Sequence, residues 1–308
     1  MAGDLPRRKQ IHSFRRRAPV DGRPRFQIAA RLLCASLLLA SCGSKNATGK
    51  NAAVEAVEIG TWNLKDFPAS TDAPGLIAGI ISALDLQLVA VQEIVDPAGV
   101  DEMLQALPGF SATLYPTTAG ATQRVGFLWD ASRLTLGAVE ALFAAETDVF
   151  PRAPLQGEFE DVVTGAHILA IVVHLKAGTT PSDEQHRVEA TTELEAKVRE
   201  TVAAGGNDRI LILGDFNEAV SDPRVNEVYG PFATRPDAYD ILTWPLAAQG
   251  ETTFLTTPLY FDHMIATAAI TGNVIGGPEV VYEETSVDNY STRVSDHRPV
   301  KMQLSMSW

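Results

Sequence analysis

Leu-Ile-Leu-Gly-Asp-Phe-Asn, at residues 211–217, is a short apolar run that ends in two polar side chains. An uninterrupted apolar run of this length is typical of a β-strand that is buried on both faces. Asp215 and Asn217 stand where such a strand leaves the core, at the edge of its sheet, which is where functional side chains are commonly found. The run therefore predicts an internal strand that brings a carboxylate and an amide to a site.

Similar apolar runs recur along the chain, with helical segments between them. Residues 73–84 place apolar side chains at helical spacing, and residues 182–203 form a strongly charged helix with Ser182 as its N-cap. These elements permit a layered α/β sandwich, in which sheets pack together and helices lie outside. The predicted strands are residues 57–62, 86–92, 125–129, 168–174, 210–213 and 261–266.

Polar side chains stand at the ends of these strands. Strand ends along one rim of a sheet converge on a cleft, so residues far apart in the sequence are expected to form one site. This set consists of Asn63, Glu93, His174, Asp215, Asn217 and Asp262, together with Asp296 and His297 before the final strand.

The chemistry of this set favours a hard cation. The carboxylates of Glu93, Asp215 and Asp296 are oxygen donors suited to Mg²⁺, and also to Mn²⁺ or Ca²⁺. The imidazoles of His174 and His297 are suited to proton transfer or to hydrogen bonds with phosphate. No pair of histidines has the spacing of a zinc protease, and the only two cysteines lie within the first 42 residues. A single one of these residues would more commonly cap a helix or form an ion pair, and only the whole set favours a catalytic site.

Five ordered motifs resemble those of the endonuclease/exonuclease/phosphatase superfamily, which includes deoxyribonuclease I. The resemblance covers about residues 55–305. It implies an α/β (α+β) fold: a four-layer α/β/β/α sandwich with two packed mixed β-sheets, deoxyribonuclease I-like. The motifs are Thr-Trp-Asn-Leu at 61–64, Val-Gln-Glu-Ile at 91–94, Val-His-Leu-Lys at 173–176, Gly-Asp-Phe-Asn-Glu at 214–218 and Ser-Asp-His-Arg-Pro-Val at 295–300.

The resemblance implies metal and water-binding roles for the acidic and amide residues. Glu93 matches the acidic metal ligand, and Asn63 matches the neighbouring amide that orients metal or phosphate. Asp296 matches a further acidic position near the metal. Asp215 and Asn217 match the pair that aligns the attacking water and a phosphate oxygen. The implied cofactor is Mg²⁺, with Mn²⁺ or Ca²⁺ as alternatives.

The resemblance also implies roles for the histidines and one arginine. His297 matches the central catalytic histidine, and Asp262 matches the carboxylate that orients it and stabilises its protonated form. His174 matches a second histidine on the leaving-group side. The family supports that histidine with a Glu, whereas this chain has Gln123-Arg124 at that place, so charge support is missing. Arg152, in an Arg-x-Pro sequence, matches an arginine that binds substrate phosphate.

The first 41 residues have the layout of an export signal, with nine basic residues and a short apolar run at residues 32–40. Leu39-Ala40-Ser41-Cys42 resembles a bacterial lipobox, which implies cleavage before Cys42 and acylation of its thiol. We therefore expect a signal peptide at 1–41, a lipidated cysteine with a flexible tether at 42–53, and a catalytic domain at 54–308. The expected location is the cell envelope, outside the cytoplasm and anchored to the membrane, with secretion after ordinary signal cleavage as the alternative.

Charge limits the choice of substrate. After residue 41 the chain carries 16 basic and 36 acidic residues, a net charge of −20. Such a surface disfavours tight non-specific binding to DNA, although bound cations would create a local positive patch. The first expectation is a monomeric extracytoplasmic nuclease, because His174 and Arg152 match nuclease positions. A phospholipid phosphodiesterase, a small phosphate-ester phosphatase and a non-catalytic binding module remain as alternatives.

Overall fold

The computed structural model describes residues 56–115, 122–220 and 226–308. The predicted signal peptide, the lipobox with Cys42 and the tether all lie outside these described residues. Within the described residues, no helix has both the length and the apolar character that a membrane span requires.

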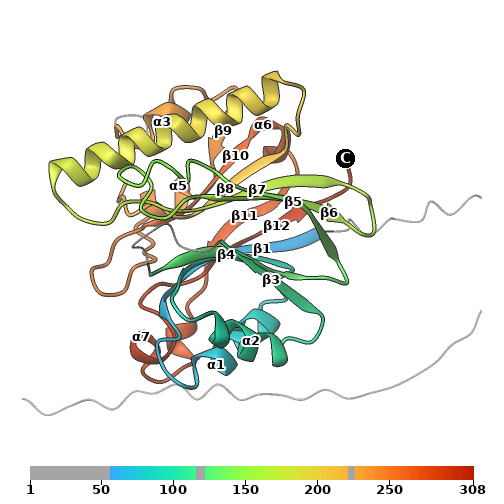
Figure 1. Ribbon diagram of the computed structural model, residues 1–308, viewed down its shortest axis with the longest axis vertical. Helices are drawn as coiled ribbons and strands as arrows, with labels where there is room; N and C mark the ends of the chain where they lie inside the picture. The colour runs from blue at the N-terminus through green and yellow to red at the C-terminus, as the bar shows by residue number, and fades with distance from the viewer. Residues whose placement is uncertain (1–55, 116–121, 221–225) are drawn as a thin grey trace, which may run out of the picture. The chain divides into compact units, whose positions relative to one another are not determined.

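The first of two six-stranded sheets contains the first and the last strand of the described chain (Figure 1). Its strand order is β11-β12-β1-β2-β4-β3, and only the β1–β2 pair is parallel. Its strands are β1 (Ala56–Phe67), β2 (Leu88–Ile94), β3 (Phe110–Leu114), β4 (Arg124–Asp130), β11 (Val274–Val280) and β12 (Val300–Ser305).

The second sheet has the order β5-β6-β7-β8-β10-β9, and only its β7–β8 pair is parallel. Its strands are β5 (Leu134–Ala141), β6 (Leu155–Asp161), β7 (His167–His174), β8 (Ile210–Asp215), β9 (Tyr239–Ile241) and β10 (Asp262–Thr267).

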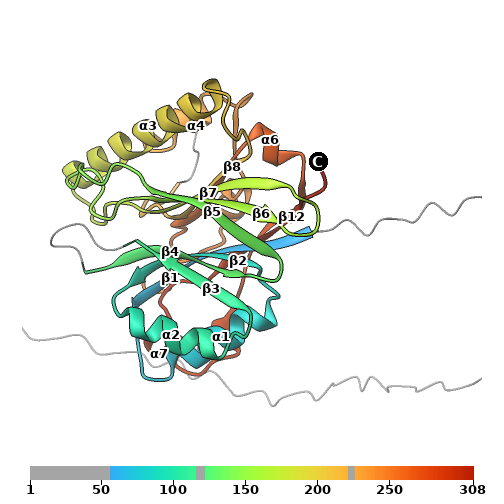
Figure 2. The same ribbon diagram turned by 45° about the vertical axis from the view of Figure 1, so that its right-hand side comes forward.

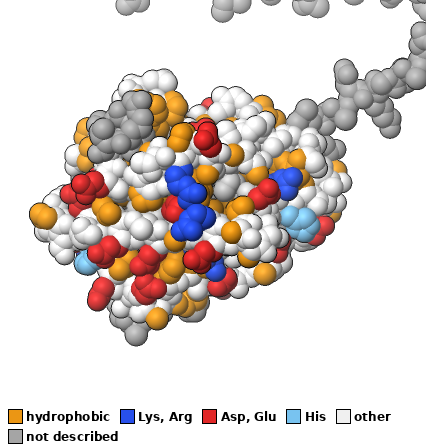
Figure 3. Space-filling model, turned by 90° about the horizontal axis from the view of Figure 1, so that it is seen from above, with side chains coloured by type: hydrophobic (Ala, Val, Ile, Leu, Met, Phe, Trp, Pro, Cys, Tyr) orange, Lys and Arg blue, Asp and Glu red, His pale blue; other side chains and the backbone are white. Residues whose placement is uncertain are grey.

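Helices cover the outer face of each sheet (Figures 1 and 2). The 23-residue α3 (Pro181–Ala203) lies over the second sheet, and its face of the molecule carries charged side chains of both signs (Figure 3). On the first sheet lie α1 (Ala73–Ala83), α2 (Pro97–Gln105) and the short α7 (Tyr290–Arg293). The remaining helices are α4 (Gly230–Ala233), α5 (Trp244–Ala248), α6 (Ala268–Thr271) and the 3-10 helix η1 (Glu283–Thr285).

Three buried clusters hold these layers together, and β8 shows why its sequence is continuously apolar. Leu211 and Leu213 pack into the cluster between the two sheets, whereas Ile210 and Ile212 pack into the cluster under α3. A third cluster lies between the first sheet and its helices. Because alternate residues of a strand point to opposite faces, burial on both faces requires apolar residues at every position. The predicted four-layer α/β/β/α sandwich is confirmed.

Two local predictions are corrected. The strand that begins near residue 57 does not end before Asn63 but continues to Phe67, with an irregular register between those two residues. The second long helix starts at Pro181, and its N-cap is Thr180 rather than Ser182. Proline suits the first position of a helix because its missing N–H is not needed there. The helix therefore begins at Pro181, and the residue before it becomes the N-cap.

Removal of the N-cap of α3 is expected to lower the stability of the fold. Thr180 and Asp183 form a reciprocal capping box, in which the Thr180 hydroxyl accepts from the Asp183 N–H at 3.2 Å. Thr180→Ala is expected to cost about 1 kcal/mol and to lower Tm by about 2–4 °C, since a helix N–H loses its partner. Thermal unfolding followed by circular dichroism measures this. Thr192→Ala, at an exposed position inside the same helix, is the matched control and should not lower Tm; equal effects would contradict the cap assignment.

Candidate active site

Three neighbouring strands of the second sheet place site residues in one register. His174 ends β7 and Asp215 ends β8, and these two residues are partners across the parallel pair. Asp262 pairs with Asp215 across the antiparallel β8–β10 pair. Asp262 lies at the start of its strand, as it does in the predicted strand at residues 261–266, and the antiparallel direction brings it to the same edge. The three side chains lie side by side.

Gly214 allows β8 to run close to β7 just before Asp215. Its φ is +149°, and a Cβ built on it would lie 2.0 Å from the Val173 carbonyl oxygen. Any side chain at this position would therefore push the two strands apart. The glycine of the Gly-Asp-Phe-Asn motif is thus a condition for the alignment of Asp215 with His174.

Asn63 joins the two sheets at the site. Its Nδ2 donates to Glu93 Oε1 at 3.2 Å and to Asp215 Oδ2 at 2.9 Å. Its Oδ1 accepts from the Lys65 N–H at 2.9 Å. The Asp66 N–H donates to the other oxygen of Glu93 at 2.9 Å, so one turn of the chain fixes both side chains. Lys65, Asp66 and Glu93 all have positive φ values, which places uncommon backbone conformations at this turn.

His297 is held by its backbone and oriented by Asp262. Its carbonyl oxygen accepts from Trp62 Nε1 at 3.1 Å and from the Tyr290 hydroxyl at 2.9 Å, and its N–H donates to Ser295 Oγ at 2.9 Å. Its Nδ1 lies 2.8 Å from Asp262 Oδ2. Burial disfavours the imidazolium, but the charge and hydrogen bond of Asp262 outweigh burial and raise the pKa of His297 to about 10. His297 is therefore protonated at neutral pH.

Asp215 is the point where these contacts meet. Its Oδ2 lies 3.7 Å from His174 Nε2 and 3.8 Å from His297 Nε2, and its Oδ1 accepts from the Asn217 N–H at 2.8 Å. Burial, with a further contribution from the negative charge of Asp262, raises the pKa of Asp215 to about 6, although His297 acts in the opposite direction. A carboxylate with a pKa near neutral is well placed to accept a proton from water.

His174 and Arg152 form a second group beside the carboxylates. Arg152 Nη2 lies 3.2 Å from His174 Nε2 and donates to Gln123 Oε1 at 2.7 Å. Gln123 therefore contacts the arginine, and its own amide donates to Asp66 Oδ1 at 2.7 Å. Burial, together with the positive charges of Arg152 and His297, lowers the pKa of His174 well below its ordinary value. His174 is thus neutral, which agrees with the missing charge support expected from Gln123.

The cleft between the sheet edges has a volume of about 630 Å³ and is lined by six of the predicted residues, whereas Asn63, Arg152 and Asp262 are not part of its lining. Asn217 lies in it with its Nδ2 donating to the Leu175 carbonyl at 3.1 Å. Asp296 lies in it 3.6 Å from Lys65 Nζ. The cleft lining includes Glu93, His174, Asp215, Asn217, Asp296 and His297.

The donor set fits a hard cation, although the structure suggests two places for one. Asp215, Asp262 and His297 offer atoms that all lie within 4.8 Å of one another. However, His297 Nδ1 and Asp262 Oδ2 are already bonded to each other at 2.8 Å. The oxygens of Glu93 and Asp215 instead point at one amide nitrogen, that of Asn63, and Glu93 is partly open to the cleft. We therefore expect the cation beside Glu93 and Asp215.

Asn63 does not offer an oxygen to that place. Its NH₂ group faces both carboxylates, because its oxygen is bonded to the Lys65 N–H. The predicted role of Asn63 as a metal ligand would require the amide to turn over. Its two amide N–H bonds are already donated to Glu93 and Asp215, so in this arrangement Asn63 orients those two carboxylates rather than phosphate.

Sequence reasoning missed three residues that build the site. Ser295 donates to the Asn63 carbonyl at 2.6 Å and accepts from the His297 N–H, so it links the two motifs. Thr253 Oγ1 accepts from the Asp262 N–H at 3.2 Å. Lys65 lies in the cleft beside Asp296. The hydroxyl two residues before His297 was a usable local signal, since Ser side chains commonly bond the backbone N–H two residues on.

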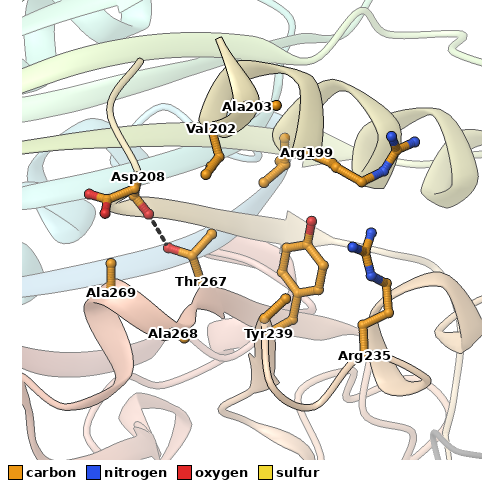
Figure 4. A pocket seen from close by; sticks show the side chains of 11 residues that line it. Arg199, Val202, Ala203, Asp208, Arg235, Tyr239, Thr267, Ala268 and Ala269 are labelled. Atoms are coloured by element: carbon orange, nitrogen blue, oxygen red, sulfur yellow. Dashed lines mark hydrogen bonds between the residues drawn. The ribbon is translucent and has the colours of Figure 1, made fainter. Parts of the chain in front are cut away.

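A second cavity, of about 380 Å³, lies at the C-terminal half of α3, where β10 continues into α6 (Figure 4). Its walls are mainly apolar, and Thr267 Oγ1 donates to the Asp208 carbonyl there at 2.6 Å. Arg199 and Arg235, at its rim, both contact the carboxylate of Glu195. The residues described around this cavity include none of the predicted site residues, so the cleft around Asp215 is the candidate active site.

Comparisons with known proteins show the fold. No protein-family model and no curated protein sequence matches the chain. Among solved structures, the human Nocturnin catalytic domain with bound sulfate has a TM-score of 0.63 at 17% identity, over 82% of this chain and 95% of that chain. An endonuclease/exonuclease/phosphatase from Bacteroides vulgatus has a TM-score of 0.61 at 15% identity, over 82% of this chain and 100% of that chain. The mannosyl-6-phosphatase of Bacteroides thetaiotaomicron has a TM-score of 0.57 at 15% identity, over 80% and 98%.

Proposed function

We propose that this chain, which has the fold of the endonuclease/exonuclease/phosphatase superfamily, is a divalent-metal-dependent phosphoesterase. The observation that carries the proposal is that Glu93, Asp215 and His297 line one cleft and that buried Asn63 donates to the first two, although 234 positions separate Asn63 from His297. A purely structural role would not require two imidazoles and several carboxylates to be buried together, because burying charge is costly.

The chain's own groups supply most of the proposed mechanism. Asp215, at the centre of the cleft, orients the attacking water and accepts a proton from it. His297, held protonated by Asp262, donates to a phosphate oxygen and stabilises charge as it develops. Arg152 binds phosphate through its guanidinium, which also donates to Nε2 of neutral His174. A divalent cation beside Glu93 would offset negative charge on the phosphate.

For the substrate, we propose a phosphodiester, with a nucleic acid as the first candidate. The pairing of Arg152 with His174 at 3.2 Å supports this choice, since it places a phosphate-binding group next to the imidazole expected on the leaving-group side. Magnesium is the proposed cofactor, with manganese or calcium as alternatives.

A small phosphate ester or a phospholipid is the second candidate, and the charge of the cleft favours it. Its described lining includes six carboxylates against the basic groups of Lys65 and Arg187. Arg187 is bonded to Glu218 at 2.8 Å, so its charge is already matched. The acidic lining of the cleft would repel a polymer that carries many phosphates. A substrate with one phosphate would instead interact mainly with the cation and with Arg152.

Chelation provides the direct test of the proposed function. Excess EDTA is expected to abolish hydrolysis of a generic phosphodiester such as bis(p-nitrophenyl) phosphate, and added Mg²⁺ or Mn²⁺ should restore it. A control with EDTA pre-saturated with Mg²⁺ separates metal removal from direct inhibition. If hydrolysis survives chelation, the activity does not depend on a divalent metal and the proposal is wrong. If no divalent cation supports hydrolysis of any phosphoester tested, a non-catalytic binding module becomes the better explanation. Plasmid DNA, RNA, sphingomyelin and sugar phosphates then rank the substrates.

We also propose that the protein is a monomer anchored outside the cytoplasm through acylated Cys42. The sequence at residues 32–42 supports the anchor, since the apolar run ends directly at the lipobox. Cys42→Ser should move the protein from the detergent-extracted membrane fraction to the soluble fraction; an unchanged distribution would contradict acylation.

A further inference from the structure

Lys65 places a positive charge inside the candidate active site. Its Nζ lies 3.6 Å from Asp296 Oδ2 and donates to the Ser291 carbonyl at 2.7 Å. Both Lys65 and Asp296 line the cleft that contains Glu93 and Asp215. The two side chains are 35% and 19% exposed, so the ion pair is partly shielded from solvent.

The backbone holds this lysine in place through the turn that orients the other ligands. The Lys65 N–H donates to Asn63 Oδ1, and the N–H of the next residue, Asp66, donates to Glu93 Oε2. Lys65 and Asp66 have φ values of 45° and 44°, in the left-handed region. A change at this turn would therefore disturb Asn63 and Glu93, and the position of the ammonium group is coupled to the position of the expected cation.

We propose that the Lys65 ammonium serves as a built-in monovalent cation on Asp296, so that the active site binds one divalent ion and not two. This inference rests on the proposed function, because it assumes a divalent ion beside Glu93. Asp296 lines the same cleft as Glu93 and Asp215, and its carboxylate is an oxygen donor of the kind that a second divalent ion would use. The ammonium group is paired with the Asp296 carboxylate, so this carboxylate is not free to bind a second ion. The positive charge of Lys65 would also repel a second divalent cation.

The inference gives Lys65 a role that differs from an ordinary surface ion pair. An exposed pair would contribute little to anything measurable. A charge that excludes a second ion would instead alter the number of ions bound and their affinity, whatever the substrate. Removing the charge while keeping the length of the side chain should therefore expose Asp296 as a ligand for a second ion.

The test is a titration of the metal-free protein with Mn²⁺. Calorimetry measures the heat of binding, and the EPR signal measures the concentration of free Mn²⁺. Wild type and Lys65→Arg, which keeps the charge, are expected to bind one ion. Lys65→Met, which keeps the length but not the charge, should bind two, with the second ion at least about tenfold tighter than any second binding in wild type. The double variant Lys65→Met/Asp296→Asn should return to one.

Each result decides the question. Two ions in wild type, or an unchanged count and affinity in Lys65→Met, would overturn the inference. A folding defect in Lys65→Met is recognised by circular dichroism, and Lys65→Gln then supplies a second neutral variant. Hydrolysis by the same wild-type sample separates the two proposals: an active, metal-dependent enzyme whose variants all bind one ion refutes only the role of Lys65. A wild type that binds no Mn²⁺ and hydrolyses nothing refutes the proposed function as well.

Discussion

Replacing His297 with alanine is expected to lower kcat by about 10³-fold while the protein remains folded. The imidazole Nε2 faces Asp215 Oδ2 at 3.8 Å, so its loss removes the group proposed to donate to phosphate. The contacts that fix this segment use the backbone of residue 297, which accepts from Trp62 and Tyr290 and donates to Ser295. Those three hydrogen bonds survive the substitution, which is why we expect folding to persist.

Alanine leaves the buried Asp262 without its partner, and this must be separated from the catalytic effect. His297→Asn is the matched variant, because its amide N–H can replace Nδ1 as the donor to Asp262 while Nε2 is lost. His167→Ala, at the exposed first residue of β7, is the control for loss of a histidine as such. Steady-state kinetics with saturating metal measures kcat, and circular dichroism reports folding. Wild-type turnover in both His297 variants would remove His297 from the mechanism.

The strands that were predicted are those in which both faces are buried. Residues 210–213 and 168–173 are apolar at every position because one face meets the other sheet and the other meets a helix. The strands that were missed have a different composition. In β5 most residues are partly or fully exposed, and β11 contains two glycines and a proline. β5 forms because it pairs with β6, and β11 forms because it pairs with β12. No periodic pattern in the sequence of either strand predicts that it is a strand.

The grouping of the candidate residues at one edge of the sheets was predictable, but their contacts were not. The position of Asp262 at the start of β10 depends on an antiparallel partner, β8, which its own sequence does not specify. Gln123 was expected next to an imidazole, whereas Arg152, contributed by a segment 29 residues away, stands between them. Such contacts follow from how the two sheets pack, and side-chain hydrogen bonds between distant segments are set only once the layers are assembled.

Asp262→Asn is expected to lower turnover at pH 8 by about 10²–10³-fold and to change the pH dependence. Burial lowers the pKa of His297, and in wild type the charge and hydrogen bond of Asp262 outweigh it and raise the pKa to about 10. Wild-type His297 therefore stays protonated up to about pH 9, and activity that needs the imidazolium is lost only as the pH rises further. Asparagine keeps an oxygen for the hydrogen bond but not the charge, so burial then has the larger effect and the pKa falls.

The loss of activity on the alkaline side should consequently move to lower pH in Asp262→Asn, and part of the missing turnover should return as the pH is lowered. A kcat profile from pH 6 to 10 at constant free metal measures this shift, and an NMR titration of His297 in the metal-free protein measures the pKa directly. Because Asp262 is proposed to act only through His297, the double variant with His297→Ala should be no slower than His297→Ala alone. Additive losses in the double variant, or a fixed alkaline limb, would show that Asp262 has a separate role.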